Sequence, residues 1–182
     1  MLPETFEGGR FRLRPFRAED LDDIYEYAND DEFLRYLPIA RPYTRDTARG
    51  FLAMVADCDQ QQRVFWAVDV GGQASGGINV RFVVGKNVAE IGYAIARRVW
   101  GQGLATSAAR LVVAAAFQSY PELRRVRASA DARNIASLRV MQKLGMTREG
   151  LLRSNRPCRD ELTDEVVYGL IREEWPAQPP RP

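Results

Sequence analysis

The chain has 182 residues, enough for one domain with a substantial hydrophobic core and too few for a second independent domain. Hydrophobic residues make up 46% of the sequence and charged residues 27%, and 26 basic against 24 acidic side chains leave a net charge of +2. This balance argues against a dedicated nucleic-acid-binding protein, and no apolar run approaches the roughly 18 residues of a membrane span, so we expect neither nucleic acid nor membrane as a partner.

Cysteine usage and the N-terminus bear on the cellular compartment. Cys58 and Cys158 have neither the spacing of metal ligands nor that of a disulfide framework. The N-terminal sequence MLPETFEGGRFRLRPF lacks the apolar run of a signal peptide. We therefore expect a cytoplasmic protein without a metal site.

The first half of the chain predicts a strand, two helices and three strands. Residues 9–16 alternate apolar and basic side chains like a strand, and apolar residues then recur at helical spacing over 17–30. Thr44 is placed to cap a second helix over 45–58. Strands are predicted at 63–70, 74–84 and 88–96, and the turn signals GG and GKN between them indicate antiparallel neighbours.

The second half predicts a helix after Gly103, a strand at 125–131, a helix from about Asn134 to Leu144 that ends at Gly145, and two strands around 149–153 and 164–172. Residues 1–175 form the predicted domain, and we expect the Pro-rich tail at 176–182 to be disordered. The element order indicates an α+β, or mixed α/β, fold with a largely antiparallel central sheet and about four flanking helices. The helical crossover makes the strands at 88–96 and 125–131 parallel, and ligands favour such crossovers.

Glycines and small residues stand directly ahead of an apolar helix in RRVWGQGLATSAARLVVAAAF, residues 97–117. A backbone without bulky side chains can approach a ligand, and the unpartnered N–H groups of a helix start suit an anion. A nucleoside-triphosphate loop requires a Lys directly after its last glycine, and no Lys follows Gly103. A dinucleotide-binding loop needs Gly or Ala where this chain has Thr106, so the sequence fits neither kind of loop. A flexible loop ahead of an ordinary core helix remains the alternative.

Two separated motifs, AEIGYAIARRVWGQGLATSAARLVVAAAF and ASADARNIASLRVMQKLGMTREGLLR, give the chain a specific resemblance to a known family. It resembles the GNAT superfamily of acyl-CoA-dependent N-acyltransferases over nearly its whole length. Within it, the sequence is most similar to the RimJ/RimL-like branch, which includes ribosomal-protein N-terminal acetyltransferases. The resemblance implies a V-shaped split between the strands at 88–96 and 125–131, which acetyl-CoA would enter.

The resemblance also implies which residues bind the cofactor. The pyrophosphate motif fits Trp100, Gly103 and Ala105, although a frame starting at Arg98 also satisfies its letters. Strand residues would lend backbone groups to the pantetheine arm, and the Asn at the head of the 134–144 helix matches the family's cofactor contact, with a plain N-cap as the alternative. The full set expected at acetyl-CoA comprises Tyr93, Ala94, Ile95, Trp100, Gly101, Gln102, Gly103, Leu104, Ala105, Thr106 and Asn134.

The chemistry is constrained by the absence of histidine from the chain. Nucleophilic schemes that need a His partner are excluded, and direct attack of an amine on the thioester in a ternary complex is what the resemblance implies. Glu90 matches a Glu often found beside the cleft, so we expect it to act as general base through a water, with a cross-strand ion pair as the alternative. Many members of the superfamily use a Tyr seven residues after the Asn, where this chain has Met141. Ser137 stands where the branch suggests contact with the leaving thiolate, with a local helix residue that has no catalytic part as the alternative. Tyr93 and Tyr168 are fallback donors.

The function that these features indicate is an acetyl-CoA-dependent N-acetyltransferase acting on a primary amine. An α-amine, with an ordinary pKa of about 7.7–8.0, loses its proton more readily than a Lys side chain at about 10.4, which favours a protein or peptide N-terminus as acceptor. A polyamine, an aminoglycoside or an amino-acid derivative is the alternative, and the acidic stretches DLDD and NDDEF could then line its pocket. A non-catalytic acyl-CoA sensor is a third reading. The sequence leaves open the acceptor, the acyl-chain preference, and whether the chain forms a homodimer.

Overall fold

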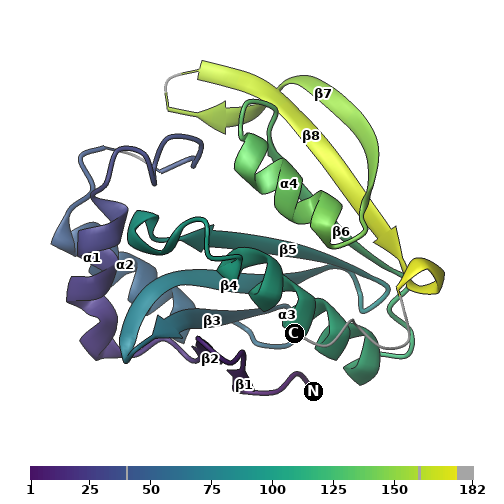
Figure 1. The fold of residues 1–182 in the computed structure, drawn as a ribbon, viewed down its shortest axis with the longest axis horizontal. Helices are drawn as coiled ribbons and strands as arrows, with labels where there is room; N and C mark the ends of the chain where they lie inside the picture. Colours follow the sequence, from purple (N-terminus) through teal and green to yellow (C-terminus); the bar gives the residue numbers. More distant parts are fainter. Residues whose placement is uncertain (40, 160, 176–182) are drawn as a thin grey trace.

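One open sheet of eight strands, in the order β1-β2-β3-β4-β5-β6-β8-β7, forms the framework of the computed structural model, which describes residues 1–39, 41–159 and 161–175 (Figure 1). The strands are β1 Phe6–Glu7, β2 Arg12–Arg14, β3 Arg63–Val70, β4 Gln73–Val84, β5 Val88–Ile95, β6 Arg125–Asp131, β7 Thr147–Cys158 and β8 Glu161–Ile171. The helices in the described part are α1 Leu21–Ala28, α2 Arg45–Ala56, α3 Leu104–Ser119 and α4 Ile135–Lys143, with short 3-10 turns at Ala18–Asp20, Arg97–Val99 and Arg172–Glu174. The mixed α/β class predicted from the sequence is confirmed.

The strands β3, β4 and β5 form an antiparallel meander in the centre of the sheet. Its turns contain Gly71, Gly72 and Gly85, all at positive φ, which only glycine adopts without strain. The predicted bounds of β3 and β6 are reproduced exactly, and α2 begins where Thr44 caps it by accepting a hydrogen bond from the Thr47 N–H.

The sheet splits between β5 and β6, as the resemblance implied. These two strands pair in parallel through only three residue pairs, Val88 with Arg125, Ala89 with Val126, and Glu90 with Arg127. Beyond that point β6 continues along β8, with which it pairs over its whole length, and β5 continues along β4. The edge of β5 past Glu90 therefore faces an opening instead of a neighbouring strand (Figure 1).

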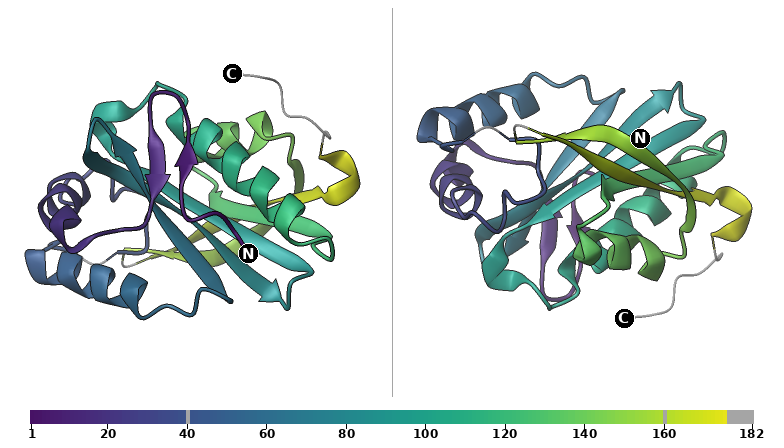
Figure 2. Two further views of the ribbon diagram at one scale, coloured as in Figure 1. Left: turned by 90° about the horizontal axis from the view of Figure 1, so that it is seen from below. Right: turned by 90° about the horizontal axis from the view of Figure 1, so that it is seen from above.

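The helices cover the two faces of the sheet in pairs, α1 and α2 on one face and α3 and α4 on the other (Figure 2). Small residues let α3 approach the sheet closely, because Ala108, Ala109, Val112, Val113 and Ala116 are fully buried. None of the helices in the described ranges is long and apolar enough to cross a bilayer.

The last two strands differ from the prediction. Strand β7 runs from Thr147 to Cys158, so Arg156 lies on a strand, whereas the strand predicted from the sequence ends around residue 153. Pairing with β8 is interrupted after Leu152, where Ser154 has a positive φ of 49°, and resumes from Arg156 opposite Thr163. A bulged strand of polar residues has no alternation of apolar and polar side chains, so the sequence did not predict a strand in the second half of β7. The two-residue strand β1 was also not predicted, and the predicted tail at 176–182 lies outside the described residues.

Candidate active site

The loop between β5 and α3 presents backbone instead of side chains at the start of the helix. Gly101 and Gly103 both have a φ of +75°, and a Cβ at either position would project into open space. Gly103 is the N-cap of α3 and has no side chain to bond the first-turn amides of Leu104, Ala105 and Thr106. A helix start of this kind leaves donors free for an anion and adds the favourable end of the helix dipole.

Two side chains of the same loop hold it in place. The indole N–H of Trp100 donates to the carbonyl oxygen of Ile95 at 2.6 Å, while its ring is about half exposed. Arg98 reaches back to β4, where its guanidinium donates to Ser75 Oγ at 3.0 Å and to the Ala74 carbonyl at 3.2 Å. Both side chains are thus engaged with strands, and the loop and first turn offer a ligand their backbone amides.

The edge of β5 that faces the opening carries backbone groups from alternate residues. The Ala96 N–H donates to the Ser75 carbonyl on β4 at 2.9 Å, and the register between these strands is regular through Tyr93 and Ile95. In an antiparallel pair the backbone groups of successive residues point to opposite edges. The amides and carbonyls of Tyr93 and Ile95 therefore face the opening, whereas those of Ala94 point to β4.

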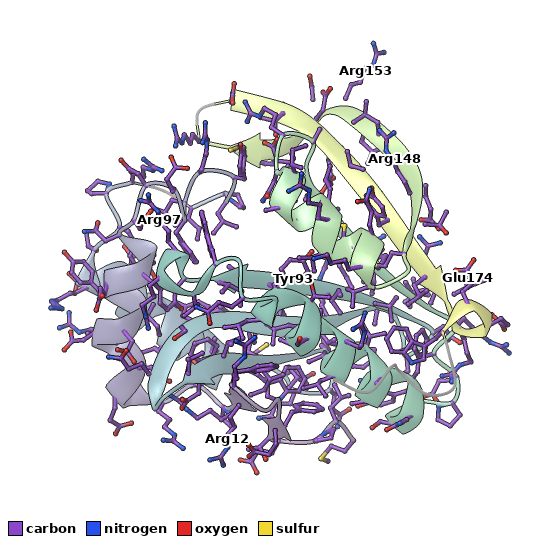
Figure 3. All side chains as sticks on the ribbon, viewed as in Figure 1. Arg12, Tyr93, Arg97, Arg148, Arg153 and Glu174 are labelled. Carbon is purple, nitrogen blue, oxygen red and sulfur yellow. The ribbon has the colours of Figure 1, made fainter. Side chains whose placement is uncertain are left out.

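The side chain of Tyr93 crosses from β5 to the first turn of α4 (Figure 3). Its hydroxyl lies 3.1 Å from Ser137 Oγ and donates to the Ser137 carbonyl at 3.1 Å. Asn134 caps α4 by accepting the Ser137 N–H at 3.1 Å. Burial raises the pKa of Tyr93 to about 12, with the Ser137 hydrogen bond opposing it, so the phenol is neutral and able to donate at physiological pH. The structure thus brings together Tyr93, Asn134 and Ser137, three of the residues singled out from the sequence.

Two cavities meet at this group. The first, of about 570 Å³, is walled by the start of α3, the end of β5 and the first turns of α4. The second, of about 360 Å³, is walled by α1, α2 and the facing strands. Both are lined by Tyr93, Ala94, Asn134 and Ser137 and by aromatic and apolar residues of the α1–α2 loop, namely Phe33, Tyr36 and Leu37. Each has the size of a small-molecule site.

Glu90 lies away from this junction. Its carboxylate accepts from Arg81 at 2.9 Å and from Arg127 at 2.9 Å, at the closed end of the split, and it lines neither cavity. The structure therefore places Glu90 in the cross-strand ion pairs that were the alternative to a role as base. Tyr168 also lies outside the junction, with its hydroxyl accepting from Gln142 Nε2 at 3.3 Å.

The acidic stretches near the N-terminus are engaged elsewhere. Asp22 pairs with Arg45, Asp20 pairs with the buried Arg14, and Asp23 accepts the Ala74 N–H. The carboxylates of the NDDEF stretch pair with arginines, and of these only Glu32 lines a cavity, the first one. Neither stretch supplies a carboxylate to the second cavity, so the acidic pocket considered from the sequence is not formed there.

The aromatic lining of the second cavity was missed from the sequence. It combines residues from the segment after β2, from α1, the α1–α2 loop, α2, β3 and β5, namely Phe16, Tyr27, Phe33, Tyr36, Tyr43, Phe51, Phe65 and Tyr93. Each fits an ordinary core position locally, and only the tertiary arrangement leaves space between them. The one available signal was the concentration of aromatic residues in the first third of the chain.

Comparison with known proteins gives a consistent result. A model of the acetyltransferase (GNAT) domain family matches residues 10–147. The chain is 29% identical to p20 of Bacillus licheniformis, named an uncharacterized N-acetyltransferase, over 94% of this chain and 98% of p20. A GNAT-family acetyltransferase from Bacillus anthracis matches with a TM-score of 0.82 and 27% identity, over 93% of this chain and 99% of that structure. Mycobacterium smegmatis RimJ, solved in complex with CoA-disulfide, shares the fold with a TM-score of 0.84 at 20% identity, over 97% of this chain and 91% of RimJ.

Proposed function

The chain belongs to the acetyltransferase (GNAT) family and is an acyltransferase, and from that premise we propose that it transfers an acetyl group from acetyl-CoA to the α-amine of a protein or peptide N-terminus. The observation that carries the proposal is the meeting of two cavities at the Tyr93 and Ser137 hydroxyls. One cavity has the backbone donors that a pyrophosphate needs, and the other is lined by the same two residues. The resemblance to the RimJ/RimL-like branch makes ribosomal proteins the first candidates.

The first cavity fits acetyl-CoA by its donors and by its glycines. The amides of Gly101 to Thr106 would bind the pyrophosphate, since Gly103 leaves the helix start uncapped. The outward-facing amide and carbonyl of Tyr93 and the amide of Ile95, whose carbonyl accepts from Trp100, would pair with the pantetheine arm as a neighbouring strand would. When bound, acetyl-CoA supplies a thioester already activated for attack by an amine.

The hydroxyls at the junction would stabilise the departing sulfur. Tyr93 is neutral, and its hydroxyl lies within hydrogen-bonding distance of Ser137 Oγ. Its single proton, which bonds the Ser137 carbonyl in this structure, would turn to the sulfur or to Ser137 Oγ, so that one hydroxyl donates to the sulfur and the other supports it. A thiol has an ordinary pKa near 8.5, so the thiolate is a good leaving group that needs a hydrogen bond more than a strong acid. This assigns the leaving-group role to a Tyr–Ser pair.

The acceptor amine has to arrive without its proton. The chain has no His, and Asp131, the one carboxylate among the described residues that lines the second cavity, is saturated by Arg133 and Thr163. Burial raises the pKa of Asp131, but the hydrogen bonds from Arg133 and Thr163 outweigh this effect and lower the pKa, which makes the carboxylate a weak base. An α-amine, neutral in part at physiological pH, suits such a site better than a Lys side chain.

Product mass and pH dependence test the proposal together. Purified protein, acetyl-CoA and short peptides with free or blocked N-termini are incubated, and the acetylated atom is located by fragment mass spectrometry. We expect acetylation of free α-amines only, with kcat/KM rising with pH and levelling near the pKa of the peptide amine, whichever peptide is used. Acetylation confined to Lys side chains, or a pH midpoint that stays constant when the amine pKa changes, would contradict it.

A further inference from the structure

The second cavity, which the proposed function assigns to the acceptor, is aromatic and positively charged. Among the described residues, its charged lining consists of Arg63, Asp131 and Arg156. Asp131 is fully buried, and its two oxygens accept from Arg133 Nε at 3.0 Å, Arg133 Nη2 at 2.9 Å and Thr163 Oγ1 at 2.8 Å. With that carboxylate neutralised, the charge that the wall offers to a bound molecule is positive.

Arg156 reaches the cavity from β7 with only part of its hydrogen-bonding capacity used. Its Nη1 donates to Glu165 Oε1 at 3.1 Å, and its side chain is one-fifth exposed. In the part of the chain that the structure describes, its Nε is buried without a hydrogen-bond partner. Buried N–H groups without a partner are rare in native proteins, because each forfeits its hydrogen bonds to water.

Glu165 does not satisfy Arg156 by itself because it is shared. Its Oε1 also accepts from Ser129 Oγ at 2.6 Å, and its Oε2 accepts from Asn155 Nδ2 at 2.6 Å. These partners fix the carboxylate to one side of the guanidinium. A guanidinium has five N–H donors in a planar fork and commonly binds a carboxylate through two of them, so Arg156 keeps donors for a second anion.

Arg63 adds a second cation, from β3, on the sheet side of the cavity. Its Nε donates to Asn79 Oδ1 at 3.0 Å, and its guanidinium stacks on Phe65 at 4.5 Å from the ring centre. Among the described residues no carboxylate lies within salt-bridge distance of Arg63, and Arg81 is its neighbour in the strand register. A partly buried cation without an anion is costly, and a bound anion would relieve that cost.

We propose that the acceptor bears a carboxylate in addition to its amine, and that Arg156, with Arg63 on the facing wall, binds this carboxylate while the amine lies at the Tyr93–Ser137 junction. The inference rests on the proposed function. The aromatic walls indicate an apolar body between the two polar ends. The carboxylate has two possible sources: an acidic side chain following a peptide N-terminus, which narrows the proposed function, or the α-carboxylate of a free aromatic amino acid, which would replace the peptide as acceptor.

The test compares acceptors that differ only in the carboxylate. One pair consists of peptides with Asp or Asn at the second position and otherwise identical sequence, and the other of an aromatic amino acid and its amide. Each is assayed with the wild type, Arg156→Gln and the control Arg153→Gln, which alters an exposed arginine on the same strand that points away from the cavity (Figure 3). Dividing wild-type by variant kcat/KM for each acceptor cancels differences in amine basicity.

We expect the wild type to favour the carboxylate member of at least one pair by roughly 10- to 100-fold, since a charged hydrogen-bonded contact is lost with the other member. The preference should fall to about threefold or less in Arg156→Gln and persist in Arg153→Gln. The pair that shows the preference identifies the source of the carboxylate. Acetyl-CoA affinity should be unchanged in Arg156→Gln, which checks that the variant is folded.

Equal use of neutral and acidic acceptors by the wild type, or a preference that survives in Arg156→Gln, would overturn the inference. Either result would leave the proposed function intact, because acetylation itself would still be observed. Failure to acetylate any acceptor, acidic or neutral, would instead refute the proposed function together with this inference.

Discussion

Tyr93 and Ser137 are the two side chains whose hydroxyls meet where the cavities join, and each has a separate structural support. Tyr93 is carried by the last residues of β5, and Ser137 is fixed in the first turn of α4 by Asn134. Their contact at 3.1 Å joins the two sides of the split. A residue pair held from two independent elements is suited to keep its geometry when ligands bind.

Substituting Tyr93 by Phe should lower kcat about 10- to 100-fold, because Ser137 alone then supports the leaving sulfur. Tyr168→Phe is the matched control, since it removes a buried hydroxyl that lines neither cavity and should leave kcat unchanged. Steady-state kinetics with saturating acetyl-CoA measure both. An equal loss of kcat in the two variants would indicate a general packing effect and contradict the assignment.

Glu90 gives a contrasting prediction. Its carboxylate ties β4, β5 and β6 together through Arg81 and Arg127, all three side chains being partly exposed. Glu90→Gln should therefore keep kcat within about threefold and reduce the free energy of unfolding by about 1 kcal/mol, the scale of such ion pairs. Denaturant unfolding and the pH–rate profile measure the two effects. A hundredfold loss of kcat with a flattened pH profile would show that Glu90 is the base after all.

The role of an individual residue could be predicted only where its side chain interacts with residues close to it in the sequence. Asn134, Ser137 and Thr44 lie at the helix starts that the sequence indicated. Arg14 could not be predicted, since it follows a surface-like alternation but is buried against Asp20 and Asp69. Likewise, no local pattern distinguishes Arg156 from its exposed neighbour Arg153.

At the scale of elements, the start of α3 is the feature on which cofactor binding depends. Gly103→Ala would place a side chain at a φ of +75° and a methyl group at the uncapped helix start. The strained conformation costs about 1–2 kcal/mol, and we expect in addition at least a tenfold weaker affinity for acetyl-CoA. Calorimetric titration and thermal unfolding separate the two effects.

Gly71→Ala is the matched control, because Gly71 also has a positive φ and open space at its Cβ but lies in the β3–β4 turn. It should lose similar stability and keep its affinity for acetyl-CoA. If both variants bind acetyl-CoA as tightly as the wild type, the helix start is not the pyrophosphate site.

Most elements could be predicted because their patterns are local. Alternation, turn glycines and caps fixed β3, β6, α2 and α4 to within a few residues. The prediction failed for β7, whose bulge and exposed polar residues break the alternation, and for β1, which has two residues. The insertion of β8 between β6 and β7 depends on long-range pairing, which no segment encodes alone.

At the scale of the whole molecule, the split between β5 and β6 connects the two faces of the sheet. It exists because β6 leaves β5 after three residue pairs and follows β8. The resemblance implied this split, but neither cavity could be outlined from the sequence, since their walls come from segments more than a hundred residues apart. The surplus of positive charge in the second cavity is likewise a property of the assembled fold.

The proposed function depends most directly on acetyl-CoA binding at the start of α3. Calorimetric titration of the purified protein with acetyl-CoA, with ATP and NAD as controls, is therefore the decisive measurement. We expect one site per chain with micromolar affinity, a free energy of roughly −8 kcal/mol, and no comparable heat from the controls. A folded sample that binds neither acetyl-CoA nor longer acyl-CoAs would contradict the account, and the glycines before α3 would then be no more than the entry to a core helix.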